Sequence, residues 1–324
     1  MKISTSKRRL VMTALVSLAA VAGGVHAQSS QPLRIVVPYP PGGTQDAMMR
    51  SIQEPLRQAL GQTIIVENRP GAAGMIGAQE VRRAAPDGNT LLLFNNGMVI
   101  TPLIQKGIAI DFAKDFSPVS PVAEGPLAIL VNASVPANNI KELIGLAKRK
   151  EGALSYASTG LGGLGHLTME LFSREAGVRL THVPYRGNAP LMLAAISGEV
   201  PVAIGTISDT VLQNVKAGKI KALGVTSRKP TPAFPGVPSV SDAIPTFEMS
   251  ASYSFLAPPG TPENVVQRLN TAIAKVLTQP DIQERFLSFG NDVQTSTPQD
   301  LGSRIAKEAA SWKKFIEESD IQFQ

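Results

Sequence analysis

The stretch that decides the fold is Arg34-Ile35-Val36-Val37-Pro38-Tyr39-Pro40-Pro41-Gly42-Gly43-Thr44-Gln45-Asp46. Its first residues have the composition of a buried strand, and the prolines and glycines predict a turn that leads into a helix. The first N–H groups of a helix lack partners within it, so such a start attracts anions. Thr44 can cap the helix, and the two glycines let a ligand approach the backbone. The alternative is a tight turn that binds nothing.

Asp46 complicates this prediction. A carboxylate in the first turn stabilises a helix but competes with a bound anion. The sequence leaves two roles open. Asp46 either acts as a cap or meets an ammonium group on an amino-acid-like ligand.

The first 27 residues have the features of a secretory signal peptide. Basic residues at positions 2, 7, 8 and 9 precede an apolar run over residues 10–22, and Val25-His26-Ala27 offers the small residues that a signal peptidase reads. The run is shorter than the roughly 20 residues that span a membrane, which argues against an anchor. We expect cleavage after Ala27 and export of the product.

Composition excludes several classes of protein. Four of the 31 basic residues and none of the 25 acidic ones lie in residues 1–27, so the remainder carries a net charge of +2. A net charge of +2 argues against a nucleic-acid-binding protein. The chain has no cysteine, so it has no disulfide or thiolate chemistry. Its 324 residues can bury an ample core and allow two lobes.

Strand and helix patterns alternate along the chain. The first series predicts strands at 33–37, 63–67 and 90–94 and helices at 46–60 and 75–84. After an irregular region, the second series predicts strands at 127–131, 153–157, 181–184, 200–204 and 221–225, with helices at 140–148, 166–175, 189–197 and 208–217. Beyond a proline-rich connection, we expect a strand at 253–257 and helices at 262–277, 281–289 and 298–319.

This alternation predicts an α/β protein of two lobes, each a mixed sheet flanked by helices. The expected division is 28–125 with 252–324 as lobe 1, and 126–251 as lobe 2. The chain then crosses twice between the lobes, which is the plan of a binding protein that closes by hinge motion. Its ligand would lie outside the carboxyl ends of the strands.

Two further glycine-rich loops each follow a strand and precede a helix. One runs from Asn68 through Gly71 and Gly74 to Gly77, and it either admits a ligand or assists helix packing.

The other loop is Ser158-Thr159-Gly160-Leu161-Gly162-Gly163-Leu164-Gly165-His166, which contains G-x-G-x-x-G. A dinucleotide site needs an acidic residue after the next strand, where Tyr185-Arg186-Gly187 stands, and a phosphate loop needs Lys in place of His166. We therefore predict a second anion-binding helix start, with the Ser158 and Thr159 hydroxyls as donors.

Catalysis has little support in the sequence. The G-x-S-x-G pattern is absent, and only His166 and His182 remain beyond the signal. We interpret His166 as a structural hydrogen-bonding residue, with a general base in a secreted enzyme as the alternative. We interpret His182 as a residue either of the core or of the layer behind the site. No cluster of His, Asp and Glu residues has the spacing of metal ligands either. We predict no catalytic residue, metal or cofactor.

The stretches at 37–46, 66–77, 85–92, 114–119, 158–167, 182–187 and 257–262 together resemble the tripartite tricarboxylate transporter substrate-binding receptors, also called the Bug family. They are ordered and spaced as in that family. The resemblance implies a periplasmic receptor with the type II two-lobe (Venus flytrap) fold. It also implies a ligand carboxylate held by backbone amides and ordered waters, without chemistry.

Carried onto this sequence, the implied ligand-binding residues are Tyr39, Gly43, Thr44, Asp46, Ala73, Asn95, Ser158, Thr159 and His166. One departure matters. Many members carry Asp after the strand at 200–204, near the far part of the ligand, whereas this chain has Gly205-Thr206. Losing that acid removes a partner for a ligand cation. It favours a di- or tricarboxylate or an aromatic acid over an amino acid.

The implied partners are a small carboxylate and the large and small membrane subunits of a tripartite tricarboxylate-type permease. The same binding physics would serve a co-receptor that presents ligand to a two-component sensor kinase, and neighbouring genes would separate the two roles. We expect a periplasmic monomer that binds no nucleic acid.

Overall fold

The computed structural model describes residues 31–105, 107–149 and 153–318. The expected signal peptide and the last residue of the expected C-terminal helix lie outside these described residues. Within them, ten strands form one mixed sheet in the order β2-β1-β3-β9-β4-β7-β5-β6, with β10 and β8 also pairing with β4.

The first half-sheet is built around the N-terminal strands. It contains β1 (Leu33–Val37), β2 (Ile64–Asn68), β3 (Thr90–Asn95), β9 (Ser250–Ala257) and β10 (Asp292–Val293). Strand β1 lies parallel to β2 and β3, whereas β9 runs antiparallel to β3. This matches the parallel β-α-β series expected for the N-terminal part, closed by a returning strand.

The second half-sheet holds the middle of the chain. It contains β5 (Ser155–Ser158), β6 (Thr181–Pro184), β7 (Val202–Thr206) and β8 (Ile220–Val225). Strand β5 is parallel to β6 and β7, and both β7 and β8 are antiparallel to β4. Both half-sheets are therefore mixed, as expected.

Strand β4 (Ser117–Asn132) joins the two half-sheets, and the sequence predicted only its second part. Residues 117–126 pair with β9, and residues 127–132 pair with β7 and β8. Prolines 118, 121 and 126 made the first part look irregular in the sequence, because proline cannot donate a backbone hydrogen bond to a neighbouring strand. The ladder accommodates two of them because its register shifts between Pro118 and Ser120 and between Pro121 and Ala123.

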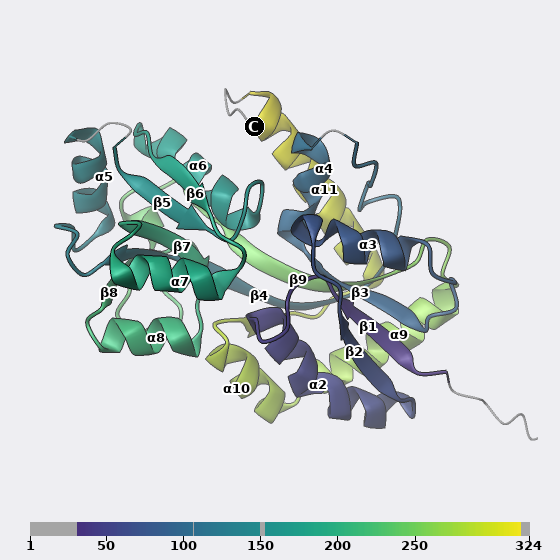
Figure 1. The fold of residues 1–324 in the computed structure, drawn as a ribbon. Coiled ribbons are helices and arrows are strands. Elements are labelled where there is room, and N and C mark those ends of the chain that lie inside the picture. The colour runs from purple at the N-terminus through teal and green to yellow at the C-terminus, as the bar shows by residue number, and fades with distance from the viewer. Residues whose placement is uncertain (1–30, 106, 150–152, 319–324) are drawn as a thin grey trace, which may run out of the picture. The chain divides into compact units, whose positions relative to one another are not determined.

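Helices flank both half-sheets (Figure 1). Beside the first lie α2 (Thr44–Leu60), η2 (Ala72–Gly74), α3 (Met75–Arg82), η3 (Asn96–Val99), α4 (Thr101–Ile104), α9 (Glu263–Leu277), α10 (Pro280–Ser288) and α11 (Pro298–Glu317). Beside the second lie α5 (Ile140–Arg149), α6 (Leu164–Ala176), α7 (Asn188–Ser197) and α8 (Asp209–Lys216). The proline-rich connection holds only the short η4 (Val240–Asp242) among its described residues.

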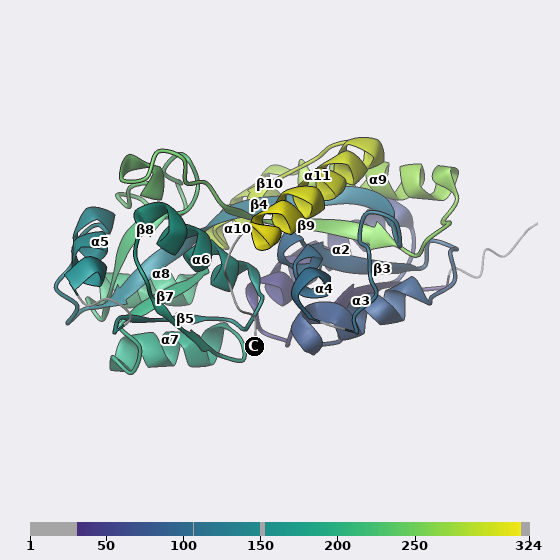
Figure 2. The same cartoon turned by 90° about the horizontal axis from the view of Figure 1, so that it is seen from above.

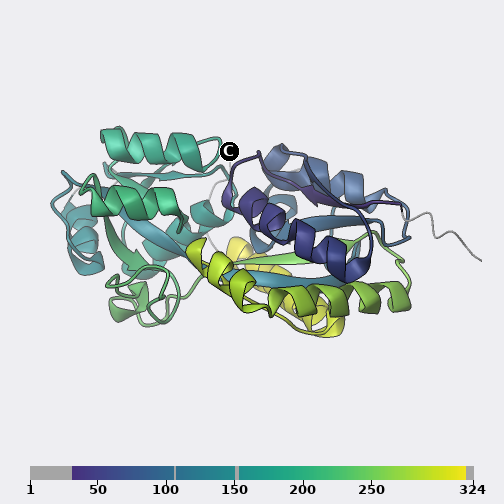
Figure 3. The same ribbon diagram turned by 90° about the horizontal axis from the view of Figure 1, so that it is seen from below.

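The C-terminal helices pack back on the first half-sheet. Figure 2 shows α11 along β4 and α9, and Figure 3 shows α2 beside α9, in agreement with their backbone contacts. Burial of Met48, Met49, Ile52 and Leu56 explains the amphipathic pattern of α2. Packing contacts join both half-sheets in one compact unit that begins at Pro32, so strand pairing rather than a gap in packing distinguishes them.

Candidate functional site

The Gly42 turn, residues 38–43, connects β1 to α2. Gly42 has a φ of +81°, a backbone conformation that glycine adopts without strain. Gly43 is the N-cap of α2, with φ −80° and ψ 168°, and no side chain bonds the helix start in the N-cap manner. The prediction that Thr44 caps the helix is therefore wrong, because Thr44 is already the first helical residue.

Asp46 closes the Gly42 turn on its own backbone. The Gly42 N–H donates to Asp46 Oδ2 at 3.0 Å, and Arg50 Nε donates to the same carboxylate at 3.0 Å. Burial raises the pKa of Asp46, but hydrogen bonds from Arg50, Gly42 and Asn68 outweigh it and leave the pKa below its ordinary value. Asp46 is only 4% exposed. Asp46 therefore bonds the residue before the N-cap, Gly42, rather than a first-turn N–H of α2.

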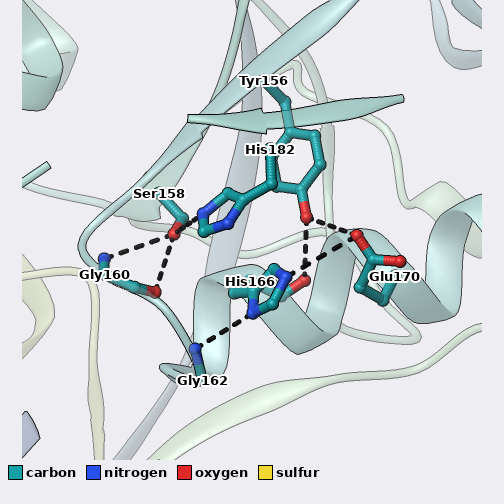
Figure 4. Close-up of polar contacts among 7 residues, drawn as sticks. All are labelled: Tyr156, Ser158, Gly160, Gly162, His166, Glu170 and His182. Atoms are coloured by element: carbon teal, nitrogen blue, oxygen red, sulfur yellow. Dashed lines mark hydrogen bonds and ion pairs between the residues drawn. The ribbon is translucent and has the colours of Figure 1, made fainter. Parts of the chain in front are cut away.

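The Gly162 turn, residues 159–163, connects β5 to α6. Gly162 has a φ of +70°, and the N-cap Gly163 has φ −76° and ψ 166°. The Gly162 N–H donates to His166 Nδ1 at 3.0 Å (Figure 4). His166 is thus a hydrogen-bonding residue of the turn, in line with the structural interpretation of the sequence.

A largely buried polar network adjoins the Gly162 turn (Figure 4). Ser158 Oγ lies 2.7 Å from His182 Nε2 and 3.3 Å from the Gly160 N–H. The rings of His166 and His182 stack with centroids 4.0 Å apart. Ser158 is 0% exposed, so its hydroxyl is enclosed by its own loop and His182.

Tyr156 and Glu170 complete this network. The Tyr156 hydroxyl donates to Glu170 Oε1 at 2.6 Å, and that oxygen lies 3.8 Å from His166 Nε2. Burial lowers the pKa of His166 to about 3, helped by His182. Burial also lowers the pKa of His182 to about 4 and raises that of Glu170. Both imidazoles are therefore neutral at pH 7.

The second glycine loop contains strained backbone. Ala72 and Ala73 have φ of +46° and +51°, and Gly74 follows at +93°. Left-handed backbone at residues other than glycine costs about 1–3 kcal/mol each and clusters at functional sites. A Cβ built on Gly74 would lie 3.4 Å from the Pro38 Cβ, so this loop packs beside the Gly42 turn. Its place supports keeping Ala73 as a candidate.

Tyr39 and Asn95 are tied to local structure. The Tyr39 carbonyl accepts a hydrogen bond from Asn68 Nδ2 at 3.1 Å, and burial raises the pKa of Tyr39 to about 12 despite a hydrogen bond with Gln45. The Asn95 side chain accepts from the Gly97 N–H at 2.9 Å and caps η3. Thr159, in contrast, is exposed.

Gly205 and Thr206 end β7 beside a residue that the sequence reasoning missed. Asn188, the first residue of α7, donates from Nδ2 to Thr206 Oγ1 at 3.0 Å. A Cβ built on Gly205 would meet Asn188 Oδ1 at 3.7 Å, an ordinary contact distance. The sequence carries no local signal for this contact; Gly187, the residue before Asn188, has a φ of +99° at the start of α7.

Segments from the two half-sheets meet around these turns. Thr44 Oγ1 lies 3.5 Å from Thr206 Oγ1. A Cβ built on Gly162 would come within 2.0 Å of Ile104 Cδ1, and one built on Gly97 within 3.0 Å of the Leu164 Cβ. The structure therefore brings the candidates Thr44 and Thr206 together, and it sets α4 and η3 against the Gly162 turn.

The described residues offer neither a metal centre nor a membrane-spanning helix. Across residues 31–105, 107–149 and 153–318, the His, Asp and Glu side chains form no group of three that could hold a metal ion. In those same ranges, no helix combines the length and apolar character needed to cross a membrane.

Comparison with known proteins places these features in a family. The sequence profile described as "Tripartite tricarboxylate transporter family receptor" matches residues 48–321. A protein of Pseudomonas sp. strain P51, described as the UPF0065 protein in the tcbD-tcbE intergenic region, is 35% identical over 318 residues, which cover 96% of this chain and 94% of the relative.

Solved structures agree. The periplasmic binding protein BugD matches with a TM-score of 0.81 at 32% identity, covering 90% of this chain and 99% of BugD. MatC from Rhodopseudomonas palustris, with bound malate, has a TM-score of 0.79 at 30% identity and coverages of 88% and 98%. R. palustris Rpa4515, with adipate, has a TM-score of 0.83 at 31% identity and coverages of 90% and 97%. The fold therefore has its counterparts in one class of protein, and the chain belongs to the tripartite tricarboxylate transporter receptor family of periplasmic solute-binding proteins, a class of receptors rather than enzymes.

Proposed function

We propose that this chain captures a small carboxylate in the periplasm and delivers it to a tripartite tricarboxylate-type permease. The observation that carries the proposal is the pair of matching helix starts. Gly43 and Gly163 cap α2 and α6 without side-chain donors or acceptors, so the first N–H groups of each helix have no acceptor within it. Two such starts, one from each half-sheet, suit a carboxylate through charge-assisted N–H donors.

The proposed ligand is a di- or tricarboxylate or an aromatic acid. Relatives near 30% identity hold malate and adipate, which are both dicarboxylates. In this chain the neighbours of Gly205 and Thr206 described above, Asn188 and Thr44, are uncharged hydrogen-bonding side chains. Such neighbours suit a second carboxylate or a hydroxyl better than an ammonium group.

The proposed ligand-binding residues come from both half-sheets. From the first we propose Tyr39, Gly43, Thr44, Asp46, Ala73 and Asn95, and from the second Ser158, Thr159, His166, Gly205 and Thr206. The polar contacts described above suggest that several of them act by shaping their loops.

We also propose the division into lobes at 28–125 with 252–324, and at 126–251. The switch of β4 from β9 to its second set of partners falls between Pro126 and Leu127, next to the proposed boundary. The proposal includes removal of a signal peptide after Ala27 and a monomeric product.

The test is ligand identification followed by a substitution in the Gly42 turn. Native mass spectrometry of protein purified without refolding should show a retained small acid, and malate or adipate should raise the melting temperature. A Cβ built on Gly43 would meet only the Pro40 carbonyl, at 3.7 Å, so Gly43→Val should fold normally yet lose the ligand-induced shift.

Two outcomes would contradict the proposal. One is a larger stabilisation by a cationic amino acid than by any carboxylate. The other is an unchanged ligand-induced shift in Gly43→Val. Permease genes beside this gene would support delivery for transport, whereas a sensor-kinase pair there would assign the same binding to sensing.

A further inference from the structure

The Gly42 and Gly162 turns share one construction. Each has a glycine in left-handed backbone followed by a glycine N-cap in extended backbone, with φ of +81° and −80° in one turn and +70° and −76° in the other. In each, the left-handed glycine donates its N–H at 3.0 Å to a side chain four residues later. The acceptors are Asp46 and His166.

This repeated bond determines which backbone groups remain for a ligand. The acceptor side chain reaches back from the first helical turn and occupies the N–H just before the N-cap. The hydrogen bond fixes the orientation of that peptide group relative to the helix, and the peptide groups between it and the helix are fixed with it. The N–H groups from the N-cap glycine onward keep one orientation before any ligand arrives, which is the preorganisation that binding requires.

Burial separates both acceptors from solvent. Asp46 and His166 are each 4% exposed. The Asp46 carboxylate already accepts from Gly42 and Arg50. His166 Nδ1 accepts from Gly162, so its ring proton lies on Nε2, which faces Glu170 Oε1 at 3.8 Å, while His182 stacks on the ring (Figure 4).

We infer that Asp46 and His166 are positioning residues of the carboxylate site. Neither touches the ligand. Each holds its glycine turn in the binding geometry by accepting a hydrogen bond from the N–H of the left-handed glycine, Gly42 or Gly162. This inference rests on the proposed function. It changes the role of Asp46 and His166 from contacting the ligand to supporting the turns that bind it. The chemistry required at both positions is a hydrogen-bond acceptor, with or without charge.

Matched substitutions separate an acceptor from a charge or a ligand contact. Asp46→Asn and His166→Asn keep an acceptor oxygen near the original atom, whereas Asp46→Leu and His166→Leu remove it. We expect the Asn variants to bind malate and adipate within about threefold of the unmodified protein, and the Leu variants to bind at least about tenfold more weakly. The preference between malate and adipate should stay the same in the Asn variants.

A second measurement does not depend on any ligand. Amide hydrogen exchange at Gly42 and Gly162, followed by NMR in the ligand-free protein, should be slow in the unmodified chain and in the Asn variants. It should be fast at Gly42 in Asp46→Leu and at Gly162 in His166→Leu, with the other turn unaffected as an internal control.

The outcomes separate this inference from the proposed function. If the unmodified protein binds neither acid while both glycine amides are protected as expected, the proposed carboxylate fails and the turn construction stands. Leu variants that fold and bind like the unmodified protein would overturn the positioning role. So would an altered preference between malate and adipate in an Asn variant, because it would mean that the side chain touches the ligand. If a Leu variant does not fold, the Asn variants and their exchange rates decide.

Discussion

The Gly42 and Gly162 turns have the same backbone but different acceptors. At the first, the acceptor is the anionic Asp46, whose charge is balanced by the half-exposed Arg50 one helical turn away. At the second, the acceptor is the neutral His166, which lies between Glu170 and His182. The geometry needed for an anion-binding helix start therefore does not fix the charge of its supporting side chain; the surroundings do.

The largest effect should come from giving the Gly162 turn the acceptor of the Gly42 turn. His166→Asp places a buried carboxylate beside the partly buried Glu170, without a counterpart to Arg50. A buried charge without a partner costs about 3–5 kcal/mol, so we expect a loss of about 4 kcal/mol in the free energy of unfolding at pH 7. Urea denaturation measures it, with His166→Asn as the neutral control at no more than about 1 kcal/mol. Equal losses in the two variants would mean that charge is irrelevant at this position.

A smaller difference should separate the two left-handed glycines. A Cβ on Gly42 would meet nothing within 4 Å, so Gly42→Ala should cost only the backbone strain, about 1 kcal/mol. A Cβ on Gly162 would lie 2.0 Å from Ile104 Cδ1, so Gly162→Ala adds a steric clash and should cost about 3 kcal/mol. Thermal unfolding of both variants checks this order. The double variant Gly162→Ala with Ile104→Val should recover part of the loss, and no recovery would argue against the contact.

The last effect, similar in size to the difference between the two glycine variants, concerns pH. Burial lowers the pKa of His166 from 6.5 to about 3. Between those values the unfolded chain binds the proton and the folded chain does not. Stability from this group is therefore complete above pH 6.5 and falls as the pH drops toward 3.

We expect the free energy of unfolding of the unmodified protein, relative to that of His166→Asn, to fall by about 2 kcal/mol between pH 7 and pH 4.5, so that His166→Asn becomes the more stable protein at pH 4.5, as measured by urea unfolding. Comparing the two proteins cancels the contribution of His182, and largely that of Glu170, whose raised pKa acts in the opposite direction. Asp46→Asn should show no such change in this range, because the pKa of Asp46 is lowered from an already acidic value. A pH-independent difference for His166→Asn would contradict the buried neutral imidazole.

Much of the fold could be predicted from the sequence, because strand and helix periodicity reports burial directly. The strands at Leu33–Val37 and Thr181–Pro184 have the predicted bounds. Helices α2 and α6 each begin two residues before the predicted start. The reason is physical: glycine N-caps carry no side chain that signals the helix end, and the side chains nearest to a capping role, Asp46 and His166, lie inside the helix.

The missed parts share a cause, since they depend on contacts between distant segments. The first part of β4 is a strand because β9 pairs with it despite its prolines. Asn188 joins the candidate site because β7 ends beside the start of α7 and brings Thr206 within hydrogen-bonding distance. No local pattern encodes either contact. The positions of the glycine-rich turns, in contrast, are local and were predicted.

Strand β4 has a consequence for how such receptors diversify. One continuous strand supplies a hydrogen-bonded edge to both half-sheets, so neither can be cut out and replaced by its counterpart from a relative without also exchanging β4. Recombination of whole lobes would break a sheet in each parent. New ligand preferences in this lineage should therefore arise through point changes around the site, while the strand that joins the halves is inherited intact.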